Sequence, residues 1–260
     1  MPGEAHTETR MAQIASLYRY PVKGFSAEAL DRTALRPRHR FEDDRLYAVE
    51  NGPSGFDPAT PAYLPKAKFL CLMKNAQLAE LRTRFDSATH VWTIEGGAEP
   101  FAADLSDPAG RAATEAFLTD FMGEARRGPL RVLSAPGHAF TDVGKPHISF
   151  INLASVGAVA DLVGASVDPL RFRANIYLDG LEPWQELDLV GREATIGPVR
   201  VRFAKRTQRC AATNVNPATA ERDLDIPGTL LRNLDHMDCG IYADVIEGGE
   251  IAVGDTFRLA

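Results

Sequence analysis

The chain of 260 residues is 45% hydrophobic and 25% charged, so it can bury a substantial core as one large domain or two smaller ones. Its formal net charge of −6 argues against nucleic acid or an anionic membrane surface as a partner, so any functional positive field must be local. No apolar run of about 18 residues could span a bilayer, and the polar, acidic residues 1–10 differ from a signal peptide. We therefore expect a cytoplasmic protein.

The N-terminal half carries three predicted strands. They contain β-branched and aromatic residues, end in glycine or proline, and cover residues 14–24, 45–52 and 90–97. Between the last two, Leu78, Leu81 and Phe85 recur at helical spacing. This spacing predicts a short helix near residues 75–85.

A longer helix is predicted over residues 106–123. Asp107 can cap it, Pro108 suits the first helical position, and Gly123 can close its end. Its expected apolar face consists of Ala113, Phe117 and Phe121.

A domain boundary is predicted near residue 125, where the sequence EARRGPL follows this helix. It divides the chain into an N-terminal unit of residues 12–125 and a C-terminal unit of residues 126–260. No internal repeat or low-complexity tract interrupts either unit.

The C-terminal unit is predicted to be mostly β. Its first strand covers residues 148–153, and a helix follows at 155–164, capped by Ser155 and ended by Gly164. Further strands are expected at 171–178, 193–197 and 199–205, and in a final hairpin whose turn at 247–250 brings 241–246 back against 251–259. Several short strands with few helices are typical of a barrel, so the predicted fold is mainly β (α+β) with a few peripheral helices.

Strand alternation over residues 171–178 predicts two different faces. Phe172, Ala174, Ile176 and Leu178 share one face, whereas Arg171, Arg173, Asn175 and Tyr177 share the other. Taken alone, the polar face is either a solvated outer surface or an anion site, because paired arginines hold phosphate through several charge-assisted hydrogen bonds.

A positive patch surrounds one cysteine. Residues 195–217 include no aspartate or glutamate and five basic residues, namely Arg200, Arg202, Lys205, Arg206 and Arg209. Val199, Val201 and Phe203 alternate with the first two arginines, which predicts a strand that ends just before Cys210. Neighbouring cations favour the thiolate, the form that attacks electrophiles or binds a soft metal. The alternative is an inert buried thiol.

The other sites of chemistry that the sequence offers are weaker. Cys71 lies among apolar residues and Cys239 lacks basic neighbours, so both are predicted to be structural. The three cysteines contain no CxxC pair, which excludes a site of four thiolates within the chain. The histidines form no HxH or HExxH motif, and P-loop, GxSxG and dinucleotide motifs are absent.

Five segments together resemble the molybdenum cofactor sulfurase C-terminal (MOSC) family, in its two-domain form with an N-terminal β-barrel. They are PVKG, DDRLYAVE, LRFRANI, RTQRCAATNVNP and EIAVGD, and the resemblance covers about residues 14–259. Gly24 stands where the family often has serine, and Ala174 stands where it often has proline.

The resemblance implies a MOSC β-barrel fold, preceded by a β-barrel-like extension, and a bound molybdenum cofactor, Mo-molybdopterin; pyridoxal phosphate is not expected. Cys210 matches the cysteine that ligates the metal and carries the catalysis. The positions that match cofactor-binding residues are Lys23, Arg45, Asn152, Ser155, Arg171, Arg173, Asn175 and Arg209.

The function that the resemblance implies is an oxidoreductase, similar to the mitochondrial amidoxime-reducing component, that reduces N-hydroxylated small molecules. Its electrons would come from a separate ferredoxin-like or flavoprotein-like partner. Two other hypotheses stay open: a carrier of the cofactor or of a persulfide on Cys210, and an anion-binding barrel without metal. No nucleic-acid or membrane partner is expected.

Overall fold

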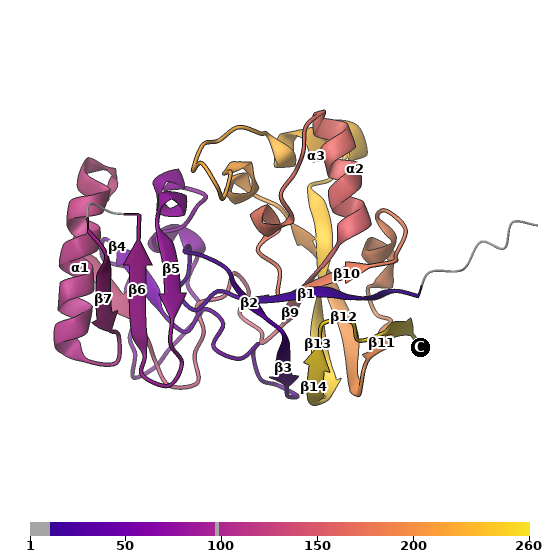
Figure 1. Cartoon of the computed structure of the whole chain (residues 1–260), viewed down its shortest axis with the longest axis horizontal. Helices are drawn as coiled ribbons and strands as arrows, with labels where there is room; N and C mark the ends of the chain where they lie inside the picture. The colour runs from indigo at the N-terminus through magenta and orange to yellow at the C-terminus, as the bar shows by residue number, and fades with distance from the viewer. Residues whose placement is uncertain (1–10, 97–98) are drawn as a thin grey trace, which may run out of the picture.

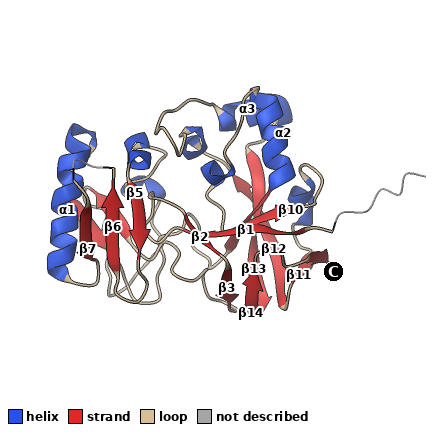
Figure 2. Cartoon of the chain, viewed as in Figure 1, coloured by secondary structure: helices blue, strands red, loops and turns tan. Residues whose placement is uncertain are grey.

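The computed structural model describes residues 11–96 and 99–260. Figure 1 shows two lobes side by side, one with α1 and β4 to β8, the other with α2, α3 and most of the remaining strands. The helices are α1 (Pro108–Met122), α2 (Leu153–Val163) and α3 (Ile226–Leu234). The strands are β1 (Gln13–Arg19), β2 (Glu28–Leu30), β3 (Arg32–Leu35), β4 (Ala48–Asn51), β5 (Arg82–Phe85), β6 (Val91–Glu95), β7 (Phe101–Asp104), β8 (Leu130–Leu133), β9 (Ile148–Asn152), β10 (Ile176–Asp179), β11 (Glu193–Ile196), β12 (Val199–Gln208), β13 (Asp238–Glu247), β14 (Gly249–Ala252) and β15 (Phe257–Leu259). Sheet predominates in the described part of the chain, as Figure 2 shows, and this confirms the predicted mainly β fold.

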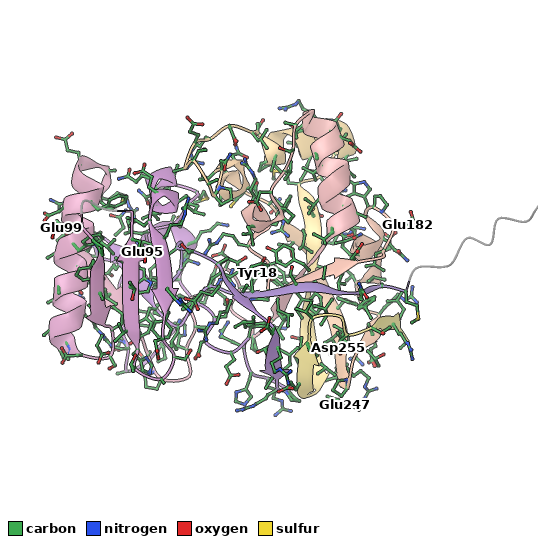
Figure 3. The ribbon with its side chains drawn as sticks, in the orientation of Figure 1. Tyr18, Glu95, Glu99, Glu182, Glu247 and Asp255 are labelled. Carbon is green, nitrogen blue, oxygen red and sulfur yellow. The ribbon has the colours of Figure 1, made fainter. Side chains whose placement is uncertain are left out.

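An eight-stranded sheet forms the larger lobe, in the order β15-β11-β12-β13-β9-β10-β1-β2. Its ladder does not close into a barrel. However, Ile14 N donates to Asp255 O at 2.9 Å and Phe257 N donates to Ala12 O at 2.7 Å, so β1 returns to the segment just before β15. Figure 3 shows Asp255 on this segment, below β1. The sheet therefore curls around its own apolar cluster, which includes Phe150.

The predicted alternation along β12 is confirmed. Val199, Val201 and Phe203 are at most 1% exposed, whereas Arg202 is exposed and Arg200 is half-buried. One side of this strand therefore belongs to the core of the larger lobe.

The smaller lobe packs α1 beside two short sheets, β5-β6-β7 and β4-β8. The predicted cap of α1 is confirmed, because Asp107 accepts hydrogen bonds from the N–H groups of Ala109 and Gly110 at 3.0 Å each. The helix ends at Gly123, also as predicted.

The apolar face predicted for α1 is only partly confirmed, because Phe117 and Phe121 pack against the apolar cluster of the lobe but stay half-exposed. The residues that α1 buries are Thr114, Leu118 and Met122. Ala113 is exposed, while Phe117 and Phe121 are half-buried. Phe117 stacks on Phe101 with ring centroids 4.7 Å apart, so it covers the rim of the lobe rather than its core.

The short helix predicted near residues 75–85 is confirmed only in its first half. The chain forms a short 3₁₀ helix at Ala76–Glu80 and then enters β5. Phe85 pairs with Trp92 of β6, so strand pairing overrides the helical spacing of the apolar residues. Leu78 and Leu81 are still fully buried in the cluster of this lobe.

The first three strands pair with the C-terminal part of the chain. β1 pairs with β10, and β3 pairs with β14. The division of the chain at residue 125 stays a prediction. β1, β2 and β3 lie with the larger lobe, whereas Val22 and Phe25 pack in the apolar cluster of the smaller one.

The final hairpin that the sequence predicts is not formed. β13 pairs with β12 and β9, whereas β14 leaves it to pair with β3. The two glycines of the turn, Gly248 and Gly249, allow this exit, since a Cβ on Gly248 would lie 2.6 Å from Leu35 O.

The segment predicted as a strand over 171–178 is a strand only in its second half. Asp168 accepts a hydrogen bond from Leu170 N at 2.8 Å and starts a 3₁₀ helix at Pro169–Phe172. Arg173 then takes a left-handed conformation with φ of 52°, and β10 begins at Ile176. The predicted alternation of faces therefore fails, because the Asp-Pro pair starts a turn.

The start of α2 differs from its prediction by three residues. Asn152 is the capping residue and accepts a hydrogen bond from Ala154 N at 3.0 Å, whereas Ser155 lies within the helix. Gly164 ends the helix in a left-handed conformation, as predicted. Across the described ranges, no helix combines the length and apolar character needed to cross a bilayer.

Candidate functional site

A cavity of about 430 Å³ lies between the two lobes. The turn after β1, the segment before β4 and the 3₁₀ helix at Lys66–Lys68 form one side of it, and β9, β12, β13 and the 169–175 segment form the other. Residues far apart in the sequence therefore line one cavity.

The cavity is strongly cationic although the chain as a whole is acidic. Two carboxylates, Asp44 and Asp142, line it. The basic side chains that line it are Lys23, Arg45, Lys66, Arg171, Arg173, Lys205, Arg206 and Arg209. Eight cations against two carboxylates in one cavity create a local positive field, which is the electrostatic character that an anionic ligand requires.

Seven of the predicted site residues meet in this cavity. They are Cys210, Lys23, Arg45, Arg171, Arg173, Asn175 and Arg209. Their contribution to binding stays a prediction, but their convergence means that one ligand could contact several of them at once.

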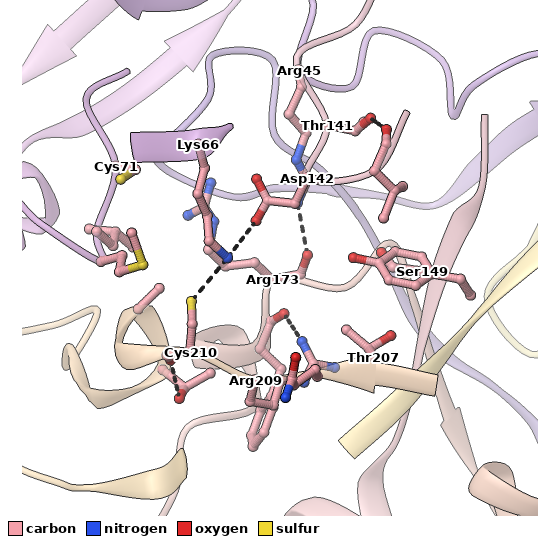
Figure 4. A pocket seen from close by; sticks show the side chains of 18 of the residues that line it. Arg45, Lys66, Cys71, Thr141, Asp142, Ser149, Arg173, Thr207, Arg209 and Cys210 are labelled. Carbon is pink, nitrogen blue, oxygen red and sulfur yellow. Dashed lines mark hydrogen bonds and ion pairs between the residues drawn. The ribbon is translucent and has the colours of Figure 1, made fainter. Parts of the chain in front are cut away.

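A series of polar contacts begins at Cys210 and crosses the cavity, as Figure 4 shows. Lys66 Nζ lies 3.2 Å from Cys210 Sγ and 3.3 Å from the Asp142 carboxylate. Asp142 also pairs with Lys23, which in turn donates to Phe140 O at 2.9 Å. Both lysines come from the N-terminal half of the chain, so this half supplies the cation that contacts the thiol.

The charges in this chain of contacts support one another. Burial alone would raise the pKa of Asp142, but Lys23 and Lys66 hold it well below its ordinary value. Burial would likewise lower the pKa of Lys66, yet Asp142 and Cys210 hold it above its ordinary value. The lysine beside the thiol is therefore a permanent cation.

Arg45 and Arg173 lie against the same aromatic ring. Their guanidinium carbons are 4.4 and 4.3 Å from the ring centroid of Tyr20, and Arg45 Nη2 donates to Arg173 O at 2.9 Å. Burial lowers the pKa of Arg173. It would lower that of Arg45 too, but Asp44 holds the Arg45 pKa above its ordinary value. A bound anion would stabilise two buried guanidinium groups held this close.

Both arginines also have an unfavourable backbone. Arg45 and Arg173 each have φ of 52°, in the left-handed region that costs a non-glycine residue free energy. Such strain persists where the surrounding structure fixes it, and it is frequent at binding sites.

Three guanidinium nitrogens in the cavity wall are buried without a hydrogen-bond partner in the described ranges. They are Arg171 Nε, Arg173 Nη2 and Arg209 Nη2. Unpaired buried N–H groups are rare and costly, and all three of these belong to arginines that line the cavity.

The remaining hydrogen bonds of these side chains fix their positions. Arg171 donates to the Asp223 carboxylate at 2.8 Å, and Arg209 Nη1 donates to Phe172 O at 2.9 Å. Asn175 Oδ1 accepts from Ser149 Oγ at 2.8 Å, which ties the segment before β10 to β9. The donors around the cavity are therefore held in place before a ligand arrives.

Gly24 follows Lys23 in the cavity wall, where the family often has serine. Its φ is 90°, and an added Cβ would lie 2.8 Å from Leu70 O. In this chain, glycine is therefore required by both backbone conformation and space.

Asn152 and Ser155 do not line the cavity, although the resemblance implies cofactor contacts for both. Each donates a hydrogen bond to the buried carboxylate of Glu186, from Asn152 Nδ2 at 3.1 Å and from Ser155 Oγ at 2.7 Å. Ser155 Oγ also accepts from Trp184 N at 2.8 Å. Both side chains hold the segment after β10 against α2.

Ser155→Ala is expected to lower the free energy of unfolding by about 2 kcal/mol while leaving ligand binding in the cavity unchanged, because Glu186 loses a donor and Trp184 N loses its acceptor. Urea denaturation measures the first effect. Ser87→Ala removes an exposed hydroxyl and serves as the control. Equal stability of the two variants would contradict the structural role, and a loss of bound cofactor in Ser155→Ala alone would show that Ser155 has the role that the resemblance implies.

The other two cysteines differ in position. Cys239 is fully buried in the apolar cluster around α2, and burial raises the pKa of its thiol to about 12, as expected of a structural cysteine. Cys71 is also buried, and burial raises its pKa, but it borders the cavity. The sequence does not indicate this neighbourhood.

The positive patch around β12 divides into two parts. Lys205, Arg206 and Arg209 border the cavity. Arg200 and Arg202 lie outside it and pair with the Glu193 carboxylate at the other end of the strand. Arg200 and Arg202 therefore lie on a solvated surface, as most charged faces of strands do.

Sequence reasoning missed Lys66 and Asp142. Lys66 lies in a short 3₁₀ helix after Pro65, with no motif around it. Asp142 lies in the segment GHAFTDVGKPH, which matches no known motif. One signal could have pointed to Asp142. The resemblance implies a basic set of cofactor-binding residues that includes a lysine, and a buried lysine needs a carboxylate partner.

Fold and cavity define a protein of two β-rich lobes that enclose a cationic, thiol-bearing pocket. The sequence pattern of the MOSC domain matches residues 138–258, and that of the MOSC N-terminal beta barrel domain matches residues 11–127. The chain therefore belongs to the MOSC family, as the sequence resemblance implies, and MOSC domains are linked to the molybdenum cofactor.

Three solved structures of bacterial proteins are similar to parts or to most of this chain. YiiM from Geobacillus stearothermophilus is 20% identical over 44% of this chain and 53% of its own length, with a TM-score of 0.35. The YUAD protein from Bacillus subtilis is 12% identical over 96% of both chains, with a TM-score of 0.45. YiiM from Escherichia coli is 17% identical over 44% of this chain, with a TM-score of 0.33. This chain spans 53% of either YiiM protein. No curated protein matches it in sequence.

Proposed function

We propose that the cavity binds the molybdenum cofactor with Cys210 as the protein ligand to the metal, and that the chain reduces N-hydroxylated compounds. The observation that supports this most is the thiol of Cys210 at a cavity lined by eight cations, with three buried guanidinium nitrogens that lack a partner within the described residues. Thiolate is a suitable ligand for a metal that prefers sulfur.

The residues present fit such a group. Arg173 and Arg209 have free N–H groups for a phosphate, and Arg45 adds a second guanidinium beside Tyr20. Lys66 Nζ lies 3.2 Å from Cys210 Sγ, so a cation faces the sulfur that would hold the metal. When bound, the cofactor would supply the two-electron redox chemistry, and the protein supplies its placement and its charge environment.

The proposed reaction needs two electrons from a second protein and two protons. R–NHOH, two electrons and two protons give R–NH₂ and water; the N–O bond breaks, nitrogen gains one proton, and oxygen leaves with the other. The electrons come from a separate ferredoxin-like or flavoprotein-like donor. The cytoplasm stays the proposed location.

Cofactor-loaded protein with a chemical reductant is expected to convert benzamidoxime to benzamidine and hydroxylaminopurine to adenine. Chromatography of the products measures the conversion, and heat-denatured protein with the same reductant is the control. If loaded protein converts neither substrate but passes its cofactor readily to an apo-enzyme, the chain is a carrier and the proposed reduction is wrong.

A further inference from the structure

One tyrosine of the cavity wall has no role in the function proposed so far. Tyr242 lies on β13, lines the cavity, and has no hydrogen-bond partner for its hydroxyl among residues 11–96 and 99–260. Its direct neighbours in the sheet are Ser149 of β9 and Lys205 of β12, which also line the cavity. Tyr242 therefore occupies the middle of the wall that these three strands form.

The ring of Tyr242 is held from two sides. Lys205 Nζ lies 5.6 Å from its centroid, and the His147 ring lies 6.0 Å away. His147 is itself fixed, because its Nδ1 lies 2.6 Å from the Asp244 carboxylate and its side chain is 6% exposed. A ring with these neighbours keeps its hydroxyl pointing in one direction.

The hydroxyl belongs to the same electrostatic environment as the thiol. Burial raises the pKa of Tyr242, and the charge of Asp142 raises it further, while Arg209, Arg45 and Lys66 act in the opposite direction. Lys66 is the residue that contacts Cys210. The phenol therefore keeps its proton and is a neutral donor in the wall of the cavity that Cys210 also lines.

Three cationic side chains of the same cavity are paired with carboxylates. Lys23 and Lys66 share the Asp142 carboxylate, and Arg45 pairs with Asp44. A free neutral hydroxyl differs from these cations because it can pair with an uncharged substrate oxygen without losing an ionic partner.

We propose that Tyr242 is a catalytic residue whose hydroxyl donates a hydrogen bond to the oxygen of the substrate N–O bond. The inference rests on the proposed function, in which this oxygen leaves as water. As the bond breaks, negative charge moves onto the oxygen, so a donor aimed at it stabilises the transition state more than the ground state.

Tyr242→Phe removes the donor and keeps the ring. In cofactor-loaded protein, kcat for benzamidoxime is expected to fall about a hundredfold, with a smaller change in KM and unchanged molybdenum and pterin content. Calorimetry on the unreduced, loaded protein is expected to show about fivefold weaker binding of benzamidoxime. Tyr18→Phe, at a tyrosine outside the cavity that packs on Tyr177, is the control and leaves both values unchanged.

Two results would overturn the inference. If Tyr242→Phe keeps the wild-type kcat, Tyr242 is not a catalytic residue. If Tyr242→Phe loses its metal and pterin, the hydroxyl holds the cofactor instead. If loaded wild-type protein is inactive, the proposed function fails, but calorimetry still decides the contact: equal affinity of wild type and Tyr242→Phe for benzamidoxime rejects it.

Discussion

The Arg173→Glu protein is expected to bind the molybdenum cofactor at least about a hundredfold more weakly than the wild type, which corresponds to about 3 kcal/mol. Arg173 lies over Tyr20, and its Nη2 is buried without a partner in the part of the chain that the structure describes. A carboxylate at this position would face the proposed phosphate and repel it. Molybdenum and pterin per chain after desalting are expected to fall from stoichiometric to background.

Arg200→Glu makes the same charge change outside the cavity and serves as the matched control. Arg200 is half-exposed on β12 and pairs with Glu193 and Glu247. Its variant is expected to keep full cofactor content. If Arg173→Glu melts at the wild-type temperature and also keeps its cofactor, the arginines do not hold a phosphate. If it does not fold, Arg173→Gln removes the charge with less disturbance and gives the same comparison.

Cys210→Ser is expected to lose the metal and to reduce N-hydroxylated substrates more than a hundredfold more slowly. The loss should exceed the 10–100-fold that is typical when only a supporting partner of a metal ligand is removed. A hydroxyl is a poor replacement for thiolate toward a sulfur-preferring metal, although the change is nearly isosteric. Elemental analysis measures the metal, and steady-state kinetics with benzamidoxime measures the activity.

Cys71→Ala tests whether the effect belongs to one thiol. Cys71 borders the same cavity, but burial keeps its thiol protonated. This variant is expected to retain metal and activity. Loss of metal in Cys71→Ala together with retention in Cys210→Ser would reverse the assignment of the ligand.

Local sequence was sufficient where a residue acts through its immediate neighbours. Asp107 caps α1, and the alternating residues of β12 divide between core and surface, because both effects depend only on positions a few residues apart. The family motifs also located seven residues that meet in the cavity.

Sequence reasoning failed where distant segments decide the structure. The spacing of Leu78, Leu81 and Phe85 suits a helix, but pairing of β5 with β6 converts its end to a strand. Arg171 and Arg173 do enter the cavity, yet they reach it through a 3₁₀ helix and a left-handed residue rather than from one face of a strand. The right residues were therefore found with the wrong local geometry.

The positions of Asn152, Ser155 and Lys66 could not be derived without the fold. Glu186, which is 31 residues after Ser155, accepts hydrogen bonds from the side chains of Asn152 and Ser155. Lys66 reaches Cys210 across 144 positions of sequence. No periodicity connects residues at such separations, so only their packing shows which polar groups already have partners.

The most direct test of the account is the molybdenum and pterin content of the wild-type chain, produced in a host that makes the cofactor and purified without added metal. Stoichiometric molybdenum with an equal amount of extractable pterin is the expected result, since the cationic cavity and the thiol of Cys210 would both be satisfied by one ligand. Background levels of both, in protein that is folded and has a free thiol at Cys210, would contradict it.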